Sequence, residues 1–332
     1  MGGVQPGALR RAQSCCRGLS ACGRVRERWL LGTRSWCSLD ESSMRGCGLS
    51  EVNGDGEDPS DLESEVAAEE VAVAPNEAAD PKAQVTAYIP ADILARYEVY
   101  SYRNAALILS KAHEAEFNEL MQALRDFTIT TTQIRTAGGN ESDIPKLLSK
   151  ALRPKGWHET IVQGDLVVKR QWRDQIRVTK TGRPVMGSMK EEKIRPKFLD
   201  GHKIDYVKGK VAFDLEWNSK DQTFDRDLYA FSAFATCGVV DVAVLVTRGV
   251  SLGRVIDRIG PALKKDGTVE MKSGLQRKTA EKYGASTTWM GKLLYRLNAG
   301  RNGACPVLAI GISPACVSDW SDDDEAAASQ PV

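Results

Sequence analysis

Apolar residues recur at helical spacing in the first part of the chain that has a folded character, which begins near Tyr88. Pro90 can open the first helix, because a proline at the first helical position loses no backbone hydrogen bond. The predicted helices are residues 90–109, residues 114–127 and a helix that Asn140 or Ser142 would cap and that runs to residue 152.

After Gly156 the pattern changes to that of strands. Residues 157–168 fit one or two strands, and the basic, polar residues 170–200 predict an irregular excursion from the sheet. Two strand runs then flank a turn at Lys208-Gly209. Further along, strands are predicted over 239–247 and 305–312, and helices over 224–237, 252–259 and 287–297. This order predicts an α/β fold with a mixed central sheet flanked by helices.

Charge is unevenly distributed along the chain. Residues 46–81 carry 11 acidic and no basic residues, and residues 317–332 carry five acidic and no basic ones. Residues 82–316 carry 37 basic and 25 acidic residues, a net charge of +12. That excess indicates an anionic partner, most commonly nucleic acid, although a solvated surface without a partner is the alternative. The basic 170–200 excursion is then a candidate to face DNA.

The ends of the chain have the composition of disordered tails, because they hold too few apolar side chains to bury. We expect a catalytic domain over 85–316, an extension over 1–84 and an acidic tail over 317–332. The Arg-rich residues 1–47 resemble a transit peptide, but we favour translated sequence upstream of a start at Met44. No long apolar run predicts a membrane span, and the cysteines of the folded body fit the reduced thiols of a cytoplasmic protein.

The strongest chemical signal is a group of carboxylates on the hairpin over 202–220. Side chains alternate along a strand, so Asp214 and Glu216 point to one side, about 6–7 Å apart, with Asn218 and Lys220. Val211, Phe213, Leu215 and Trp217 point to the other side, into the core. Asp205, on the preceding strand, can reach the acidic face.

Clustered carboxylates repel one another unless a cation or a proton neutralises them. Oxygen ligands suit Mg²⁺, for which Mn²⁺ can substitute, and this arrangement is typical of phosphodiester hydrolysis. The alternative is a solvated strand face whose carboxylates pair with nearby lysines.

The order of these motifs resembles the BglII/BstYI family of type II restriction endonucleases, in the wider PD-(D/E)xK superfamily. Asp205 is followed nine residues later by Asp214-Leu-Glu216, within the run Lys-Gly-Lys-Val-Ala-Phe-Asp-Leu-Glu-Trp-Asn-Ser-Lys over 208–220. The matching stretches are residues 202–205, 208–221, 224–228, 240–248, 283–288 and 303–308.

The resemblance implies a restriction-endonuclease-like fold, Mg²⁺ dependence, and cleavage of double-stranded DNA at a short palindrome by a homodimer. It implies that Asp205 bridges the metal and the scissile phosphate, that Asp214 and the Leu215 carbonyl are metal ligands, and that Glu216 holds or activates the attacking water. Glu216 departs from the Gln of better-known members and the Lys of the superfamily, and Asp214 is shorter than the usual Glu. An alternative register uses Asp205, Glu216 and Asn218, with Lys220 as the missing cation.

Secondary candidates lie elsewhere in the chain. Glu98, expected in the first helix, could be an accessory carboxylate, and Arg226 could contact a phosphate. Asp227, near the start of the same helix as Arg226, fits a charge that compensates the helix dipole. The candidates for DNA contact at a helix start are Ser286, Thr287, Thr288 and Lys292. Two other functions stay open: a catalytically silent DNA-binding or regulatory protein on the same scaffold, and a structure-specific repair nuclease.

Overall fold

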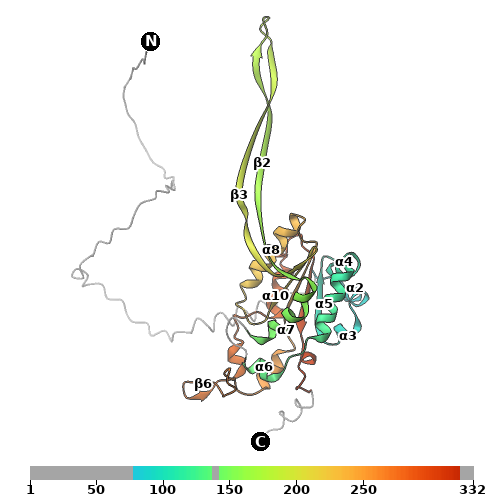
Figure 1. The fold of residues 1–332 in the computed structure, drawn as a ribbon, viewed down its shortest axis with the longest axis vertical. Coiled ribbons are helices and arrows are strands. Elements are labelled where there is room, and N and C mark those ends of the chain that lie inside the picture. Colours follow the sequence, from blue (N-terminus) through green and yellow to red (C-terminus); the bar gives the residue numbers. More distant parts are fainter. Residues whose placement is uncertain (1–77, 137–141, 322–332) are drawn as a thin grey trace, which may run out of the picture. The chain divides into compact units, whose positions relative to one another are not determined.

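The computed structural model describes residues 78–136 and 142–321, and these form a six-stranded mixed sheet in the order β1-β8-β5-β4-β3-β2 (Figure 1). β4 pairs parallel with β5 and β5 parallel with β8, whereas the other neighbours are antiparallel. The strands are β1 (Tyr97–Tyr102), β2 (His158–Val178), β3 (Pro184–Lys208), β4 (Val211–Glu216), β5 (Val242–Arg248) and β8 (Val307–Ile312). The predicted α/β fold with a mixed central sheet is confirmed.

Helices cover both faces of the sheet and close a separate core on each. α8 and α10 pack on one face, and the other described α-helices pack on the opposite face or at its edges. The helices are α2 (Lys82–Tyr88), α3 (Ala91–Leu94), α4 (Ala105–Ala112), α5 (Glu114–Asp126), α6 (Thr131–Thr136), α7 (Asp143–Leu152), α8 (Thr223–Thr236), α9 (Gly253–Arg258) and α10 (Met290–Asn298).

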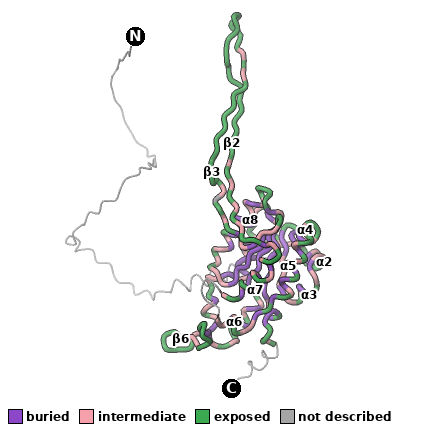
Figure 2. Tube along the Cα trace, in the orientation of Figure 1, coloured by how far each residue is buried: buried purple, intermediate pink, exposed green. Residues whose placement is uncertain are grey.

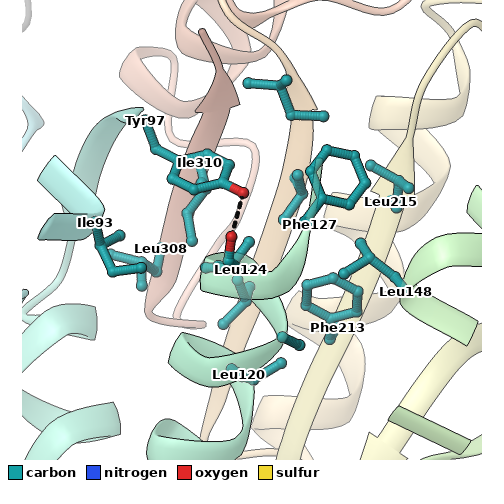
Figure 3. Packing of buried hydrophobic residues seen from close by; sticks show 14 of the residues in the cluster. Ile93, Tyr97, Leu120, Leu124, Phe127, Leu148, Phe213, Leu215, Leu308 and Ile310 are labelled. Atoms are coloured by element: carbon teal, nitrogen blue, oxygen red, sulfur yellow. Dashed lines mark hydrogen bonds between the residues drawn. The ribbon is translucent and has the colours of Figure 1, made fainter. Parts of the chain in front are cut away.

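The larger core joins the helices of the N-terminal part to the middle of the sheet. Figure 3 shows Phe213 and Leu215 of β4 among side chains from α5 and α7. Tyr97 of β1 crosses this core, and its hydroxyl donates to the carbonyl of Leu124 over 2.7 Å. β4, β5 and β8 are buried along their whole lengths, as their apolar composition predicts for strands covered on both faces.

The predicted helix over 90–109 is wrong. This stretch instead forms α3, the edge strand β1 and α4. Arg103 and Asn104 both adopt positive φ, near 60°, which ends the strand and prevents a continuous helix. The tyrosine- and valine-rich run of β1 suits a strand, and β1 gains a full ladder of antiparallel pairs with β8. Tertiary pairing therefore overrides the helical spacing.

The predicted irregular excursion over 170–200 is also wrong. β2 and β3 pair with each other almost to their connecting turn at residues 179–183, where Gly182 has φ 81°. Lysines and arginines obscure the strand alternation there, because they occupy both faces of the ribbon. The predicted turn at Lys208-Gly209 is confirmed, with Gly209 at φ 55° between β3 and β4.

The other predicted helices are found within a few residues of their expected bounds. α7 follows Ser142, although that hydroxyl makes no capping hydrogen bond, and Asn140 lies outside the described residues. α2 begins at Lys82, ahead of the boundary expected at residue 85. Most of the expected N-terminal extension and acidic tail also lies outside the described residues. None of the described helices is long and apolar enough to cross a membrane.

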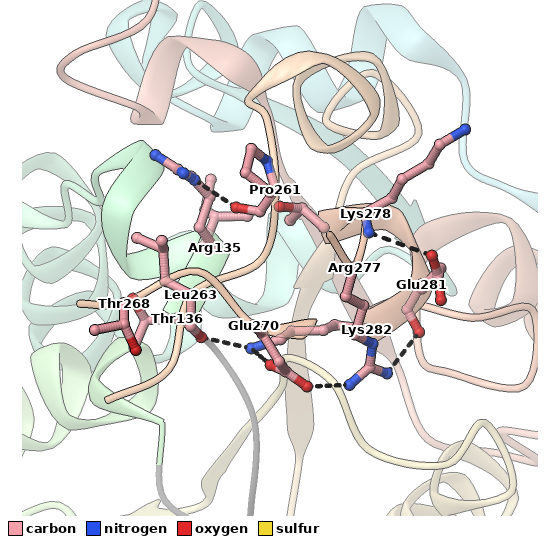
Figure 4. A network of polar contacts seen from close by, with 12 residues as sticks. Arg135, Thr136, Pro261, Leu263, Thr268, Glu270, Arg277, Lys278, Glu281 and Lys282 are labelled. Atoms are coloured by element: carbon pink, nitrogen blue, oxygen red, sulfur yellow. Dashed lines mark hydrogen bonds and ion pairs between the residues drawn. The ribbon is translucent and has the colours of Figure 1, made fainter. Parts of the chain in front are cut away.

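A polar network fixes the segment between α9 and α10, which carries the short hairpin β6 (Met271–Lys272) and β7 (Leu275–Gln276). Glu270 is its centre, paired with Arg277 at 2.6 Å and with Lys282 at 2.7 Å (Figure 4). Arg135 of α6 donates to the carbonyl of Pro261 at 2.8 Å. These contacts hold residues 261–282 against the end of the sheet where β4 stops, since Asn218 donates to the Lys282 carbonyl.

Truncation of Phe213 tests this packing. Phe213 is 1% exposed, so Phe213→Ala should lower the free energy of unfolding by about 3–5 kcal/mol, through lost burial and the cavity left behind. Tyr229→Ala is the matched control, because Tyr229 is 61% exposed and its loss should change stability by less than about 0.5 kcal/mol. Equal urea midpoints for the two variants would contradict the assigned core.

Candidate active site

The turn between β3 and β4 brings Asp205 and Asp214 together. Tyr206 pairs with Phe213 across the two strands, and their rings meet edge to face at 5.3 Å on the side of the larger core. The neighbouring pair, Asp205 and Asp214, therefore faces the other side. The backbone N–H of Asp205 donates to Oδ1 of Asp214 over 2.7 Å, which fixes the orientation of the Asp214 carboxylate.

Glu216 lies two residues further along β4 on the same face as Asp214. Both carboxylates are buried, with Asp214 3% exposed and Glu216 7% exposed, and Asp205 is half-buried. The apolar residues between and beside them belong to the larger core on the opposite face, as the alternation predicted: Val211, Phe213, Leu215 and Trp217. The alternation thus places these carboxylates on one face.

A further carboxylate, that of Asp227, joins this group from α8. It is 1% exposed, and its Oδ1 lies 3.4 Å from His202 Nε2 and 3.2 Å from an Nη atom of Arg226. The sequence suggested only a helix-start charge for Asp227. A stronger signal was available, because Asp227 occupies a position of the buried stripe formed by Phe224, Leu228 and Phe231. We define these four carboxylates, Asp205, Asp214, Glu216 and Asp227, as the acidic cluster.

Burial and the neighbouring negative charges raise the pKa of three members of the acidic cluster: Asp205, Asp214 and Glu216. Burial is the main cause that raises the pKa of Asp214 well above its usual range, and the charges of Asp227 and Asp205 add to it. Burial and Asp227 likewise raise the pKa of Glu216 to about 7. The pKa of Asp205 is also raised, first by burial and then by Asp227. Asp227 is thus the charged neighbour that affects the other three carboxyls most.

The chain itself supplies little compensation for this charge. Oxygens Oδ2 of Asp214, Oε2 of Glu216 and Oδ2 of Asp227 are buried without a hydrogen-bond partner. Within residues 78–136 and 142–321, Asp205 and Asp214 form no ion pair. Arg226 reaches Glu216 at 3.9 Å, but its own side chain is 58% exposed. Three buried oxygen acceptors with a deficit of positive charge match what a hard divalent cation requires.

The described side chains do not form a ready-made metal cage of three or more His, Cys, Asp or Glu residues. Mg²⁺ does not require one, because it is typically held by one or two carboxylates together with water and substrate phosphate. The acidic cluster fits that mode of binding. The proposed metal contact of the Leu215 backbone carbonyl stays a prediction, and the Leu215 side chain lies in the larger core.

Glu98 is not brought to the acidic cluster. It lies on β1, not on a helix, and β8 and β5 separate β1 from β4. Its carboxylate accepts hydrogen bonds from the backbone N–H groups of Val250 and Ser251 and from the Ser251 hydroxyl. Glu98 therefore anchors the loop before α9, and its expected role as an accessory carboxylate is wrong.

Asn218 and Lys220 do not follow the predicted strand alternation, because β4 ends at Glu216. Asn218 donates to the Lys282 carbonyl over 3.1 Å, and its Oδ1 is buried without a partner. Lys220 is exposed, and its backbone bridges to Thr287. Among the described residues, Arg226 and His202 form the ion pairs with these carboxylates, and Lys220 forms none with them.

The polar residues before and within α10 mostly serve the internal structure. Thr288 is fully buried, so the expected contact with DNA is wrong for this residue. The Thr287 hydroxyl contacts Arg248 and the Gly284 carbonyl, and the buried Lys292 pairs with Asp221 at 3.0 Å. Ser286 is half-buried, and its carbonyl accepts from the backbone of Asp221.

Arg248 was not singled out from the sequence, yet it fixes the backbone beyond Glu216. It is 5% exposed and donates to the carbonyls of Trp217 and Thr288, at 3.0 Å and 2.7 Å. Its guanidinium also lies over the ring of Tyr283 at 4.8 Å. Burial lowers the pKa of Arg248 to about 10. Nothing in its local sequence distinguishes this arginine from an exposed one.

Comparison with known proteins agrees with this arrangement. The family model described as restriction endonuclease BglII/BglIII matches residues 97–312, which run from the start of β1 to the end of β8 and include the whole acidic cluster. A search of curated proteins found no matching relative. Because the family match covers well over half of the 332 residues, the chain belongs to the BglII/BglIII restriction endonuclease family, a family of DNA-cutting nucleases.

Proposed function

We propose that this protein is a Mg²⁺-dependent type II endodeoxyribonuclease that cuts double-stranded DNA at a specific short sequence. The observation that carries the proposal is the set of buried, unpartnered carboxylate oxygens of Asp214, Glu216 and Asp227. Family membership supplies the substrate class, and the net charge of +12 over residues 82–316 is consistent with an anionic substrate.

In this proposal each member of the acidic cluster has a distinct role. Asp205 and Asp214 would hold Mg²⁺, with Asp205 also facing the scissile phosphate and the Leu215 carbonyl as an additional ligand. When bound, the metal polarises the phosphoryl group and stabilises the leaving oxygen. Glu216, at the C-terminal end of β4, would orient the attacking water and accept its proton. Mn²⁺ would substitute for Mg²⁺, because the ligands are all oxygen atoms.

Asp227 and Arg226 complete this proposal from α8. The charge of Asp227 raises the pKa of the other three carboxyls more than any other charge does. Asp227 would therefore help to hold the metal or its bound water. Arg226 is half-exposed beside Glu216 and Asp227, a position that suits a contact with a DNA phosphate at the mouth of the site. A palindromic target implies a homodimer, because the two-fold symmetry of the DNA site matches the two-fold symmetry of a dimer.

DNA cleavage is the direct test. The purified protein should cut phage DNA into discrete bands with Mg²⁺ or Mn²⁺ and leave it intact with EDTA. Asp205→Asn, Asp214→Asn and Glu216→Gln should each lower the cleavage rate by about a thousandfold, because each removes a charge used at the reacting phosphate. Asp227→Asn should lower it about tenfold or more.

Asp126→Asn is the control for these variants, because Asp126 is an exposed carboxylate on α5 and its loss should leave cleavage unchanged. A smear in place of bands would point to a nuclease without sequence specificity. Absence of metal-dependent cleavage on varied duplex and branched DNA would overturn the proposal and favour a silent DNA-binding scaffold.

The raised pKa values predict how stability depends on pH without metal. Below about pH 3 the carboxyls of Asp205, Asp214 and Glu216 are protonated in both the folded and unfolded states. As the pH rises toward 7, the unfolded chain loses these protons while the folded chain retains them. Stability should therefore fall by up to about 1.4 kcal/mol per pH unit for each retained proton. Thermal melts in EDTA should show this loss from about pH 4, where the unfolded carboxyls titrate, to about pH 7, the pKa of Glu216 in the folded chain.

Metal and the Asp214→Asn substitution should both relieve this loss. Mg²⁺ at a hundred times its dissociation constant should stabilise the wild type at pH 8 by about 2.7 kcal/mol. Asp214→Asn should melt at higher temperature than the wild type at pH 8 in EDTA, with a flatter pH dependence and little response to metal. Equal pH profiles for the two proteins would contradict the assigned electrostatics.

A further inference from the structure

Beyond the acidic cluster, the most unusual feature is the ribbon that β2 and β3 form outside the sheet. β3 pairs with β4 only at residues 206–208, so residues 158–203 form a two-stranded ribbon with no third strand (Figure 1). We define the arm as residues 165–199. From residue 167 to 198 every position is exposed except Val185 and Gly187, which are half-buried (Figure 2).

The arm carries an unusual surface for a free element. Most of the exposed large apolar side chains of the described chain lie on this ribbon, and among them Trp172 and Met189 face each other across its strands. An isolated two-stranded ribbon is marginally stable in water, and both of its edges have unpaired backbone groups. The arm therefore has the character of a surface that a partner covers.

Charge identifies the chemistry of that partner. The arm holds ten basic and four acidic residues, a net charge of +6 within 35 residues. This is half of the whole +12 excess of residues 82–316. Two of the ten basic side chains pair within the ribbon: Lys169 with Glu192 and Arg170 with Glu191. The other eight form no ion pair with any described residue: Arg173, Arg177, Lys180, Arg183, Lys190, Lys193, Arg195 and Lys197.

We propose that the arm is a second DNA-binding element, which holds the duplex beside the cleavage site through its phosphates and a groove. This inference rests on the proposed function of the acidic cluster. A two-stranded ribbon fits the major groove of B-DNA, and strands are established readers of either groove. Lysines and arginines on both faces would reach phosphates, while the interleaved apolar side chains would contact sugars and bases.

The connection between the arm and the acidic cluster supports this placement. β3 runs without a break from the arm to Asp205. Residues 184–199 lie six to 21 positions before Asp205, which is roughly 20–70 Å along the strand. One turn of DNA is about 34 Å long. The pairing of β2 with β3 shifts in register at residues 162–166 and 175–177, and such bulges bend a ribbon. A bent ribbon can follow a bound duplex and does not have to point away from it.

A second copy of the chain suits the arm less well. Protein interfaces are depleted of lysine at their centres, whereas basic residues interrupt the apolar positions on both faces of the arm. The rest of residues 82–316 also has a net charge of +6, so the folded body of a second copy would repel the arm. The observations therefore favour duplex DNA.

The test removes four arm charges from the full chain by replacing each residue with glutamine. The arm variant is Arg173→Gln, Arg177→Gln, Lys180→Gln and Arg183→Gln. All four side chains are exposed, so the thermal melt should not change. The matched control removes four exposed basic side chains elsewhere: Lys111→Gln, Lys150→Gln, Lys264→Gln and Lys265→Gln.

Binding is measured by fluorescence anisotropy on a labelled 40-base-pair duplex of mixed sequence, in EDTA, over a series of KCl concentrations. The arm variant should bind at least tenfold more weakly than the wild type at 0.1 M KCl. Its slope of log affinity against log salt should be smaller by about 2–4, because each lost phosphate contact contributes about 0.9. The control should stay within about twofold of the wild type.

A second variant separates charge from ribbon structure. It deletes residues 168–193 and joins Val167 to Ile194, which are paired in the ladder, through an Asn-Gly turn. This variant should show the same loss of DNA affinity. Its oligomeric state, measured by sedimentation, should be that of the wild type. A lost dimer with an unchanged salt slope would overturn the inference in favour of a second copy.

The two proposals fail separately. If the wild type cleaves DNA with Mg²⁺ but the arm variant binds with the wild-type affinity and slope, the arm inference is wrong and the nuclease proposal stands. If no cleavage occurs but binding still depends on the arm, the nuclease proposal fails and the arm is a DNA-binding element of a silent scaffold.

Discussion

The repulsion among four carboxyl groups, which β3, β4 and α8 bring together on one face of the sheet, is the constraint on which the site depends. Folding buries Asp214, Glu216 and Asp227 almost completely, and the described chain offers them Arg226 and His202 but no lysine partner. A structure built only for stability would place apolar side chains there, as it does on the opposite face of β4. The apolar sheet supplies the rigidity that keeps these carboxylates together against their repulsion.

The sequence predicted the centre of the fold well, because its signals there are local. Long apolar runs identified the buried strands, and strand alternation assigned Phe213 and Leu215 to one face and Asp214 and Glu216 to the other. The motif order also led to the right family. The assignment of faces depends only on the alternation of side chains along a strand, which holds for every strand once its position in the sequence is known.

The sequence was less informative where long-range pairing decides the outcome. β1 has helical spacing but becomes an edge strand, because β8 presents a free edge to it. The arm was expected to be irregular, since its alternation is masked by lysine and arginine. Asp227 was underestimated because its proximity to β4 arises only when α8 packs on the sheet, and Lys220 was overestimated because β4 ends at Glu216.

One measurement tests the central claim directly: the position of Mn²⁺ in crystals of the protein soaked with that ion, located by its anomalous scattering. The account predicts a single strong peak per chain within ligand distance of Asp214 and at least one of Asp205, Glu216 and Asp227. Crystals at neutral pH with no peak at these carboxylates, or with a lysine or arginine side chain in the space between them, would contradict it.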